Sequence, residues 1–201
     1  MSNNPMEIIA RVTAIFVQID QQVAAFQLAT GLRCPNGCGN CCADADVHTT
    51  PLEMLPAAHE ILCRGESAFW LERIQAQAPE RACVFYQHHP AADAQGHCAI
   101  YALRPAICRL FGFAAVRNRK GSLELAACKY LKQSNPDDVA RARAQQSQAP
   151  CFTHPSTLLK TLDLSASDLM PINAALRHAI LRLGLQMQMA HSESLGITSA
   201  A

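Results

Sequence analysis

The sequence predicts a mostly α-helical protein of the α+β class, in which N- and C-terminal amphipathic helices cover a cysteine-rich core with a short β-hairpin. Three observations support this prediction. Apolar residues recur every three or four positions near both ends of the chain, which is typical of helices. Turn signals and short apolar runs lie between these segments, as expected for short strands. Half of the 201 residues are hydrophobic, which is enough to form a substantial core.

The first helix has the clearest signals. Asn4 is a candidate N-cap, Pro5 suits the first helical position, and Gly31 marks the end. The apolar stripe of this helix predicts a face that packs on the core or forms a dimer contact, and core packing is the stronger hypothesis. The stripe consists of Ile8, Val12, Ile15, Phe16, Ile19, Val23 and Phe26.

Shorter elements are expected in the middle of the chain. Thr50 and Glu53 have the spacing of a capping box, which predicts a helix from Thr50 to about Cys63. A third helical segment follows over about 66–78. Beyond it we expect a short strand at 97–101 and a turn or short helix that begins at Arg104.

A hairpin and further helices complete the predicted order. Strands at 110–116 and 122–127 are joined by the turn signal at 118–121. Asn135 is expected to cap a polar helix that runs to about Gln148, and a leucine-rich segment follows from Ser156. The last helix is expected over 171–191, with a stripe of Ile172, Leu176, Ile180, Leu183 and Met187.

These elements divide the chain into three parts of one globular unit. They are an N-terminal helix at 1–33, a cysteine-cluster core at 34–130 and a C-terminal helical extension at 131–201.

Composition excludes several classes of partner. The net charge is +1, from 17 basic and 16 acidic residues, so there is no electrostatic case for nucleic acid. No apolar run is long enough for a membrane span, and the first residues do not resemble a secretory signal. We therefore expect a cytoplasmic protein whose ten cysteines are reduced rather than paired in disulfides.

One loop is unusually rich in thiols. The segment 34–42 carries four cysteines and two glycines within nine residues. Glycines let the backbone fold tightly, and several thiolates drawn to one point suit a soft or borderline metal. Cys41 and Cys42 are adjacent, so both can bind one ion only if the chain turns sharply between them; otherwise they serve two ions or one does not ligate. Two nearby sites are the favoured hypothesis.

The ten cysteines do not have equal claims to a ligand role. Cys63 lies near a helix end and is interpreted as a small buried hydrophobe, and Cys151 stays open as a ligand. Eight others lie in turns, at strand ends or beside Gly and Pro, and eight is twice the four thiolates of a closed zinc site. The predicted metal ligands are Cys34, Cys38, Cys41, Cys42, Cys83, Cys98, Cys108 and Cys128.

Other side chains have weaker claims. Histidine is a common metal ligand, and His48, His88, His89 and His97 lie close enough in sequence to complete a site. Asp44 and Asp46 are more simply explained as capping or solvated residues. Arg104 and Arg109 flank Cys108 and could compensate thiolate charge, while Arg109 has the alternative of binding an anionic substrate. Tyr101 is expected to pack its ring beside the site.

The cysteine pattern resembles that of the YkgJ-type cysteine-cluster family, which is described as zinc- or iron-chelating. The loop Cys34-Pro-Asn-Gly-Cys38-Gly-Asn-Cys41-Cys42 is similar to the opening motif of the family. The later motifs are matched by Cys83-Val84-Phe85, Cys98-Ala99-Ile100-Tyr101, Arg104-Pro105-Ala106-Ile107-Cys108-Arg109-Leu110-Phe111 and a cysteine after the hairpin, Cys128. The flagellin lysine N-methylases look like relatives, so the resemblance also implies a methyl-transfer role as an alternative.

The metal and the function therefore stay open at the level of sequence. Zinc is favoured over an iron–sulfur cluster, since the cysteine spacings match neither ferredoxin pattern, and copper is a further option. The first hypothesis is a metal-binding protein whose cluster organises the fold and presents a surface to a protein partner. The alternatives are an enzyme, either a redox protein or a protein-modifying transferase, and a metal carrier.

Overall fold

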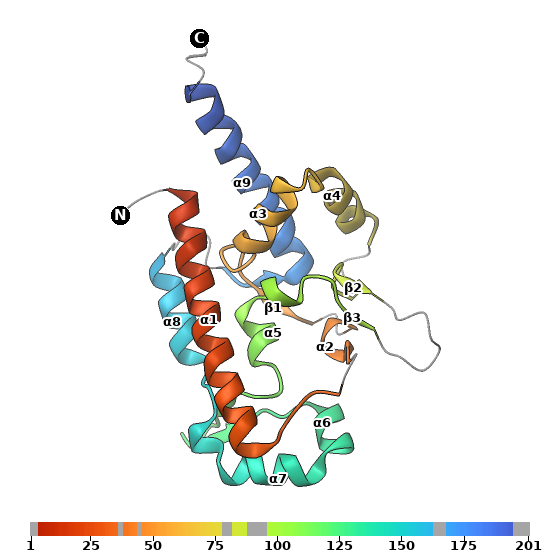
Figure 1. Ribbon diagram of the computed structural model, residues 1–201, viewed down its shortest axis with the longest axis vertical. Coiled ribbons are helices and arrows are strands. Elements are labelled where there is room, and N and C mark those ends of the chain that lie inside the picture. The colour runs from red at the N-terminus through yellow and green to blue at the C-terminus, as the bar shows by residue number, and fades with distance from the viewer. Residues whose placement is uncertain are drawn as a thin grey trace.

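The structure is a computed structural model that describes residues 4–35, 38–43, 46–77, 82–87, 96–162 and 168–194. It confirms the predicted class, because long helices enclose short antiparallel strand pairs (Figure 1). The α-helices are α1 (Pro5–Thr30), α2 (Asn40–Ala43), α3 (Leu55–Cys63), α4 (Ser67–Ala76), α5 (Ala106–Leu110), α6 (Lys129–Ser134), α7 (Pro136–Ala144), α8 (Thr153–Leu162) and α9 (Ile172–Ser194).

The signals at both ends of α1 act as the sequence predicts. The Asn4 side chain accepts a hydrogen bond from the Met6 N–H at 3.0 Å, and Pro5 occupies the first turn. At the other end Gly31 adopts a φ of 75°, and its N–H donates to the Gln27 carbonyl. The predicted stripe is buried except for Ile8, which is partly buried beside the buried Ile9.

The helices pack around one continuous core. In Figure 1, α1 lies beside α8 on one flank, α3 packs against α9 at one end, and α6 and α7 lie at the other end. Helix α5 sits in the middle and contacts α1. The division of the chain at 33/34 and 130/131 stays a prediction.

Helix α9 is buried only over its first half. Ile172, Leu176, Ile180 and Leu183 are buried as predicted, but Met187 is 40% exposed and does not belong to the core face. In Figure 1 the C-terminal end of α9 extends past the other helices, so no helix among the described residues covers that end.

The short strands form three antiparallel pairs, each tying together separate parts of the described chain. Strand β1 (His48–Thr49) pairs with β6 (Met170–Pro171), so the segment after the cysteine loop is joined to the start of α9. Strands β2 (Tyr86–Gln87) and β3 (His97–Cys98) form the second pair, and β4 (Ala115–Arg117) and β5 (Leu123–Leu125) form the third.

Some element boundaries differ from the sequence prediction. The expected hairpin exists, but its first strand begins at Ala115, because the residues before it form α5 and a turn. Helix α7 ends at Ala144 and the 3-10 helix η2 (Gln146–Gln148) follows. Asn135 stands at the N-cap of α7, yet its side chain makes no capping bond and its Nδ2 donates instead to the Arg33 carbonyl.

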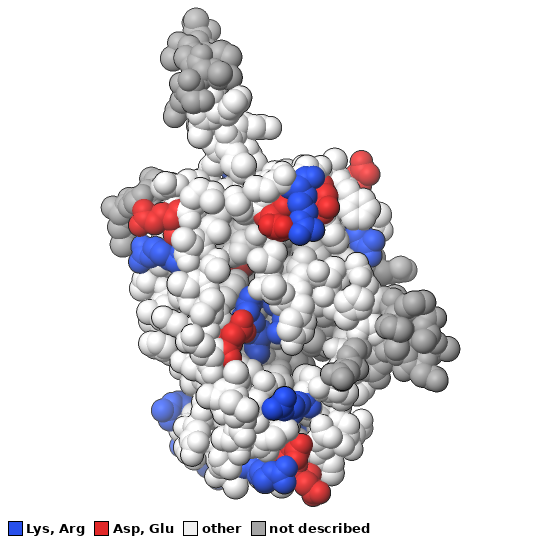
Figure 2. Space-filling model, in the orientation of Figure 1, with Lys and Arg blue, Asp and Glu red and all other residues white. Residues whose placement is uncertain are grey.

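Two properties of the described residues bear on membrane crossing and on surface charge. No helix among the described residues combines the length and apolarity that a membrane crossing needs. On the face seen in Figure 2, acidic and basic side chains are interspersed and no broad patch has a single sign of charge.

A buried carboxylate connects α3 to α5. Glu53, only 7% exposed, lies in the turn before α3 and accepts a hydrogen bond from the Ala106 N–H at 2.8 Å, at the first residue of α5. The Thr50 hydroxyl accepts from the Glu53 N–H, and the Thr50 N–H donates to the Glu53 carboxylate, which completes the predicted capping box. The Thr50 hydroxyl also donates to this carboxylate at 3.3 Å. Helix α3 itself starts later than predicted, at Leu55, because this box closes a turn. Glu53 therefore fixes the start of the helix that carries Cys108.

The environment of Glu53 predicts a pH dependence of stability. Burial raises the pKa of this carboxyl group above its ordinary value of 4.5, and the hydrogen bonds from Ala106 and Thr50 oppose that rise. In the interval between 4.5 and the raised pKa, the folded state binds more protons than the unfolded state. The contribution of Glu53 is thus fully present below pH 4.5 and is lost as the pH rises through the folded pKa.

We expect Glu53→Gln to remove this titration. The unfolding free energy of the wild type minus that of the variant should rise as the pH is lowered through the folded pKa, and should level off below pH 4.5. Urea unfolding of both proteins, at matched metal content over a pH series, measures this difference. A difference that is constant with pH would contradict the prediction.

Candidate metal centre

The predicted ligands come from separate segments that backbone contacts hold together. Cys41 and Cys42 lie on α2, the Cys83 N–H donates to the Cys42 carbonyl at 2.9 Å, and Cys98 on β3 pairs with Tyr86 on β2. Cys108 lies on α5. Because α2 is a helical turn, the chain bends sharply at the adjacent cysteines, which was the condition for both to serve one ion.

The position of the cysteine loop is fixed by a very close contact between Gly39 and the residues Tyr86 and Gly96. A Cβ atom on Gly39 would lie 2.4 Å from Cε2 of Tyr86 and 2.8 Å from the carbonyl oxygen of Gly96. Gly96 itself has a φ of 107° and is packed just as closely on the Tyr86 ring. Only glycine fits at these two positions, so the start of α2 sits directly on the β2–β3 hairpin.

Five of the eight predicted thiols line one small cavity. Its volume is about 10 Å³, at the lower limit of what one water molecule occupies. Apolar side chains that include Val47, Phe85 and Ile100 form the rest of the wall, together with Arg104. The cysteines in this wall are Cys41, Cys42, Cys83, Cys98 and Cys108.

The other three predicted ligands form a second group around Cys34, which also has Cys41 as a neighbour. The Cys34 residue is exposed, yet partial burial of its thiol, together with the charges of Cys38, Cys128 and Cys41, raises its pKa to about 12. The Asn40 amide donates to the Cys38 sulfur at 3.3 Å, and the Cys128 sulfur accepts from the Leu131 N–H at the start of α6. Cys41 thus belongs to both groups of thiols.

Hydrogen bonds between thiols determine which cysteine loses its proton first. The Cys42 thiol donates to the sulfurs of Cys41 and Cys98, which raises the pKa of Cys42. The same bond lowers the pKa of Cys41 to about 6, against the effect of burial and with help from Arg104. The hydrogen bond from Cys42 to the Cys98 sulfur likewise lowers the pKa of Cys98.

Burial dominates at two other thiols of the cavity. It raises the pKa of Cys83 to about 12, and it also raises the pKa of Cys108, where the charges of Cys83 and Cys41 act in the same direction. These thiols accept negative charge only with a compensating cation beside them.

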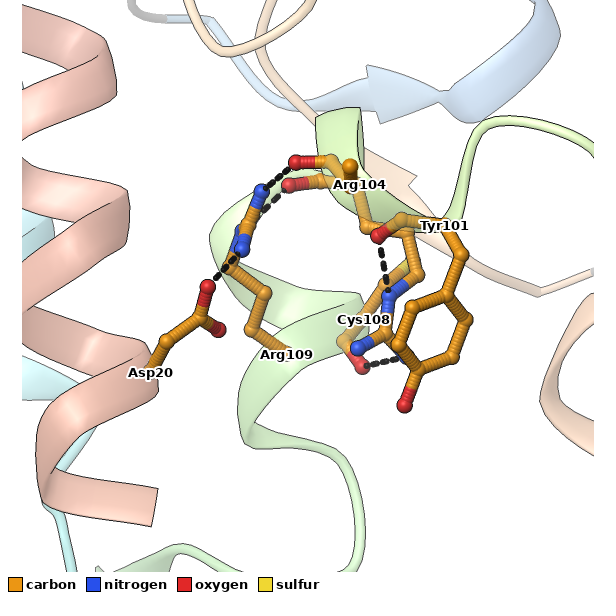
Figure 3. A network of polar contacts seen from close by, with 6 residues as sticks. Asp20, Tyr101, Arg104, Cys108 and Arg109 are labelled. Carbon is orange, nitrogen blue, oxygen red and sulfur yellow. Dashed lines mark hydrogen bonds and ion pairs between the residues drawn. The ribbon is translucent and has the colours of Figure 1, made fainter. Parts of the chain in front are cut away.

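Arg104 is the cation of the cavity, whereas Arg109 is not. The charge of Arg104 lowers the pKa values of Cys34, Cys41, Cys98 and Cys108 against the opposing effects. Its guanidinium lies 3.5 Å from the centre of the Tyr101 ring and donates to the Tyr101 and Cys108 carbonyls (Figure 3). Tyr101 is 64% exposed, so its ring packs on this arginine more than on the sulfurs.

The two remaining cysteines, Cys63 and Cys151, do not line the cysteine cavity, and the prediction for Cys63 was wrong. Cys63 is exposed, not buried, because it lies on the outer face of α3, where its sulfur is 3.5 Å from Nε2 of His59. Cys151 interacts with the Thr153 hydroxyl at 3.1 Å and with the charge of Arg117. Both contacts are local, between residues four and two positions apart in the sequence.

The histidine and aspartate candidates receive little support. His48 is paired with Asp46 through Nδ1, and the His97 side chain is exposed on β3. His88, His89 and Asp44 lie outside the described residues.

The donor set fits a thiophilic metal, although it is not yet arranged as a coordination shell. Within the described ranges, no three Cys, His, Asp or Glu side chains already surround one point as ligands do. Yet five thiols share one cavity, and rotation of a side chain between staggered positions changes the direction in which its sulfur points. Sulfur donors of this kind suit zinc and iron.

Comparison with protein families agrees with this chemistry. A family model called CxxCxxCC and described as "Putative zinc- or iron-chelating domain" matches residues 33–135, about half of the chain. The chain belongs to the CxxCxxCC family. Membership supports metal binding in general and confirms the resemblance inferred from the motifs. In this member of the family, three residues rather than two separate the first pair of cysteines, Cys34 and Cys38. No curated protein and no solved structure matches the chain.

The close approach at Gly39 gives a direct test of how the loop is held. We expect Gly39→Ala to destabilise the protein by roughly 2 kcal/mol, a fall in melting temperature of about 4–8 °C, because the new methyl group overlaps Tyr86 and the Gly96 backbone. Differential scanning calorimetry measures the change.

Gly184→Ala is the matched control. Gly184 lies inside α9, and the nearest atom to an added Cβ is Cδ2 of Leu62 at 3.5 Å, an ordinary contact. The methyl group should therefore stabilise the helix by up to about 1 kcal/mol. Equal effects of the two substitutions would refute the special role of Gly39.

Proposed function

We propose that this protein is a metal-binding protein in which eight cysteines hold about two zinc ions at adjacent thiolate sites, and that these ions organise the fold. The observation that carries the proposal is the convergence of thiols from α2, β3, α5 and the turn before β2 on one cavity lined by Arg104. Four thiolates close a tetrahedral zinc site and leave it without redox chemistry.

The two groups of thiols suggest how the ligands divide. Cys34, Cys38 and Cys128 would act together with Cys41, while Cys42, Cys83, Cys98 and Cys108 would form the site in the cavity. Cys41 neighbours both groups, so its thiolate would bridge the ions or exchange between them.

A reducing compartment such as the cytoplasm suits this proposal. All ten cysteines of the chain lie in described segments, and none of them forms a disulfide. Thiols that remain reduced are available to a metal.

An iron–sulfur cluster is the second candidate, because the description of the family includes iron. Elemental analysis of protein purified without oxygen decides between the two. Zinc without sulfide supports the proposal, whereas iron with inorganic sulfide and visible charge-transfer absorption would replace it with the cluster.

Loss of one ligand should reduce metal content and stability together. We expect Cys38→Ser to lower both the bound metal and the melting temperature, by about 4–8 °C or roughly 2 kcal/mol, because metal binding is coupled to folding. Cys63→Ser, on the exposed face of α3, should change neither quantity. Metal analysis and calorimetry of the two variants give the comparison, and equal small effects would refute the ligand assignment.

The division of the ligands makes a sharper prediction. Cys128→Ser and Cys98→Ser should each remove about one of two metal ions, whereas Cys41→Ser should weaken both sites, since Cys41 neighbours both groups. Native mass spectrometry counts the ions bound to each variant. Complete loss of metal from Cys128→Ser would show a single cluster in place of two sites.

A further inference from the structure

Arg109 is a buried charge that the metal ligands do not explain. The residue is 5% exposed, and each of its three guanidinium nitrogens has a partner. Nε donates to the Arg104 carbonyl at 2.7 Å, Nη2 donates to the Ala102 carbonyl, and Nη1 pairs with the Asp20 carboxylate (Figure 3). Because all three nitrogens already have partners, the Arg109 guanidinium is not available to bind an anionic substrate. The structure therefore argues against the substrate-binding role considered from the sequence.

The acidic partner comes from a distant part of the chain. Asp20 lies on α1, one helical turn after Phe16, whose ring lies 4.6 Å from the Arg109 guanidinium. The Asp20 side chain is 49% exposed, whereas that of Arg109 is almost wholly enclosed. A buried guanidinium requires a compensating charge, and the Asp20 carboxylate on α1 provides it for Arg109 on α5.

The carbonyls held by Arg109 belong to the segment that presents Arg104. This segment includes the 3-10 helix η1 (Tyr101–Leu103) and leads into α5. The Arg104 side chain extends from it to the wall of the cysteine cavity, where it bonds the Cys108 carbonyl at 3.3 Å. The direction in which Arg104 points therefore depends on a backbone that Arg109 and Asp20 hold.

We propose that Asp20 and Arg109 are positioning residues, which hold Arg104 at the cysteine cavity and thereby slow the release of a bound metal ion. This proposal rests on the proposed metal-binding function. Arg104 carries the positive charge at the cavity wall, and a cation held beside the sulfur ligands offsets the net negative charge of a metal ion bound by thiolates. If the Arg104 side chain moved away from the cavity, its positive charge would no longer stabilise the bound ion.

The test uses the metal-loaded protein as purified. The measured quantity is the rate at which bound metal passes to excess EDTA, at a temperature well below the melting transition. We expect Asp20→Asn to accelerate this transfer roughly 10-fold, the lower end of what substitutions outside the ligand set cost in metal affinity. Glu60→Gln is the control, because it removes a carboxylate from the Glu60–Arg64 pair at the C-terminal end of α3 and should leave the rate unchanged.

A double-mutant cycle separates positioning from a general loss of stability. Asp20 and Arg104 act on the rate through one route, so Asp20→Asn combined with Arg104→Gln should release metal no faster than Arg104→Gln alone. If the rate increases caused by the two single substitutions multiplied in the double mutant, the proposal would be overturned. Far-UV circular dichroism establishes that each variant is folded at the temperature used.

Arg109→Lys provides a second variant if Asp20→Asn does not fold. Lysine keeps the charge opposite Asp20 but cannot bond two carbonyls and the carboxylate in one fixed plane, so it too should accelerate transfer. An unchanged rate in the folded variant would refute the positioning role. A wild-type protein that carries no metal would instead overturn the proposed function itself.

Discussion

Negative charge is costly at the thiols around the cysteine cavity, because burial disfavours it and neighbouring thiolates repel one another. Burial contributes most to the raised pKa values of Cys34, Cys83 and Cys108, and the charges of other thiols add to it. The protein lowers the cost in two ways. Cys42 shares its proton with two neighbouring sulfurs, and Arg104 brings one positive charge to the cavity wall. A divalent metal ion, as proposed, would supply the remaining positive charge.

The surrounding fold supports the sulfurs from three directions. Glu53 holds the start of α5 from the side of α3, and Arg109 connects the segment before α5 to α1. The close contact of Gly39 with Tyr86 and Gly96 holds the start of α2 against strands β2 and β3. These contacts involve no sulfur, so packing and hydrogen bonding contribute to the positions of the cysteine backbones in addition to the proposed metal ions.

The sequence predicted features whose causes are local. Asn4, Pro5 and Gly31 delimit α1 because each acts within one turn of the helix end, and the Thr50–Glu53 box depends on a spacing of three residues. Features that arise from distant partners were missed. The Arg109–Asp20 pair joins residues 89 positions apart, and no local pattern announces it.

Two errors have the same physical origin. Cys63 was interpreted as buried and Met187 was placed on the core stripe, because residue type and helical period describe a face but not what covers it. The wall of α3 at Cys63 and the far end of α9 have no covering element in the described structure. The cysteine cluster could be predicted because its signal is density of one residue type, which needs no knowledge of packing.

The spacing of the cysteines also has a consequence for the order of events during folding. Four of them lie within nine residues, whereas Cys83, Cys98, Cys108 and Cys128 join only after long stretches of chain have closed. Closing short loops is much faster than closing long ones. An ion that meets the nascent polypeptide would be captured first by the short loop, in a partial shell open to wrong sulfurs. The complete shell of ligands forms only as the later segments fold onto this loop, so binding of the proposed ions and folding of the chain would be completed together.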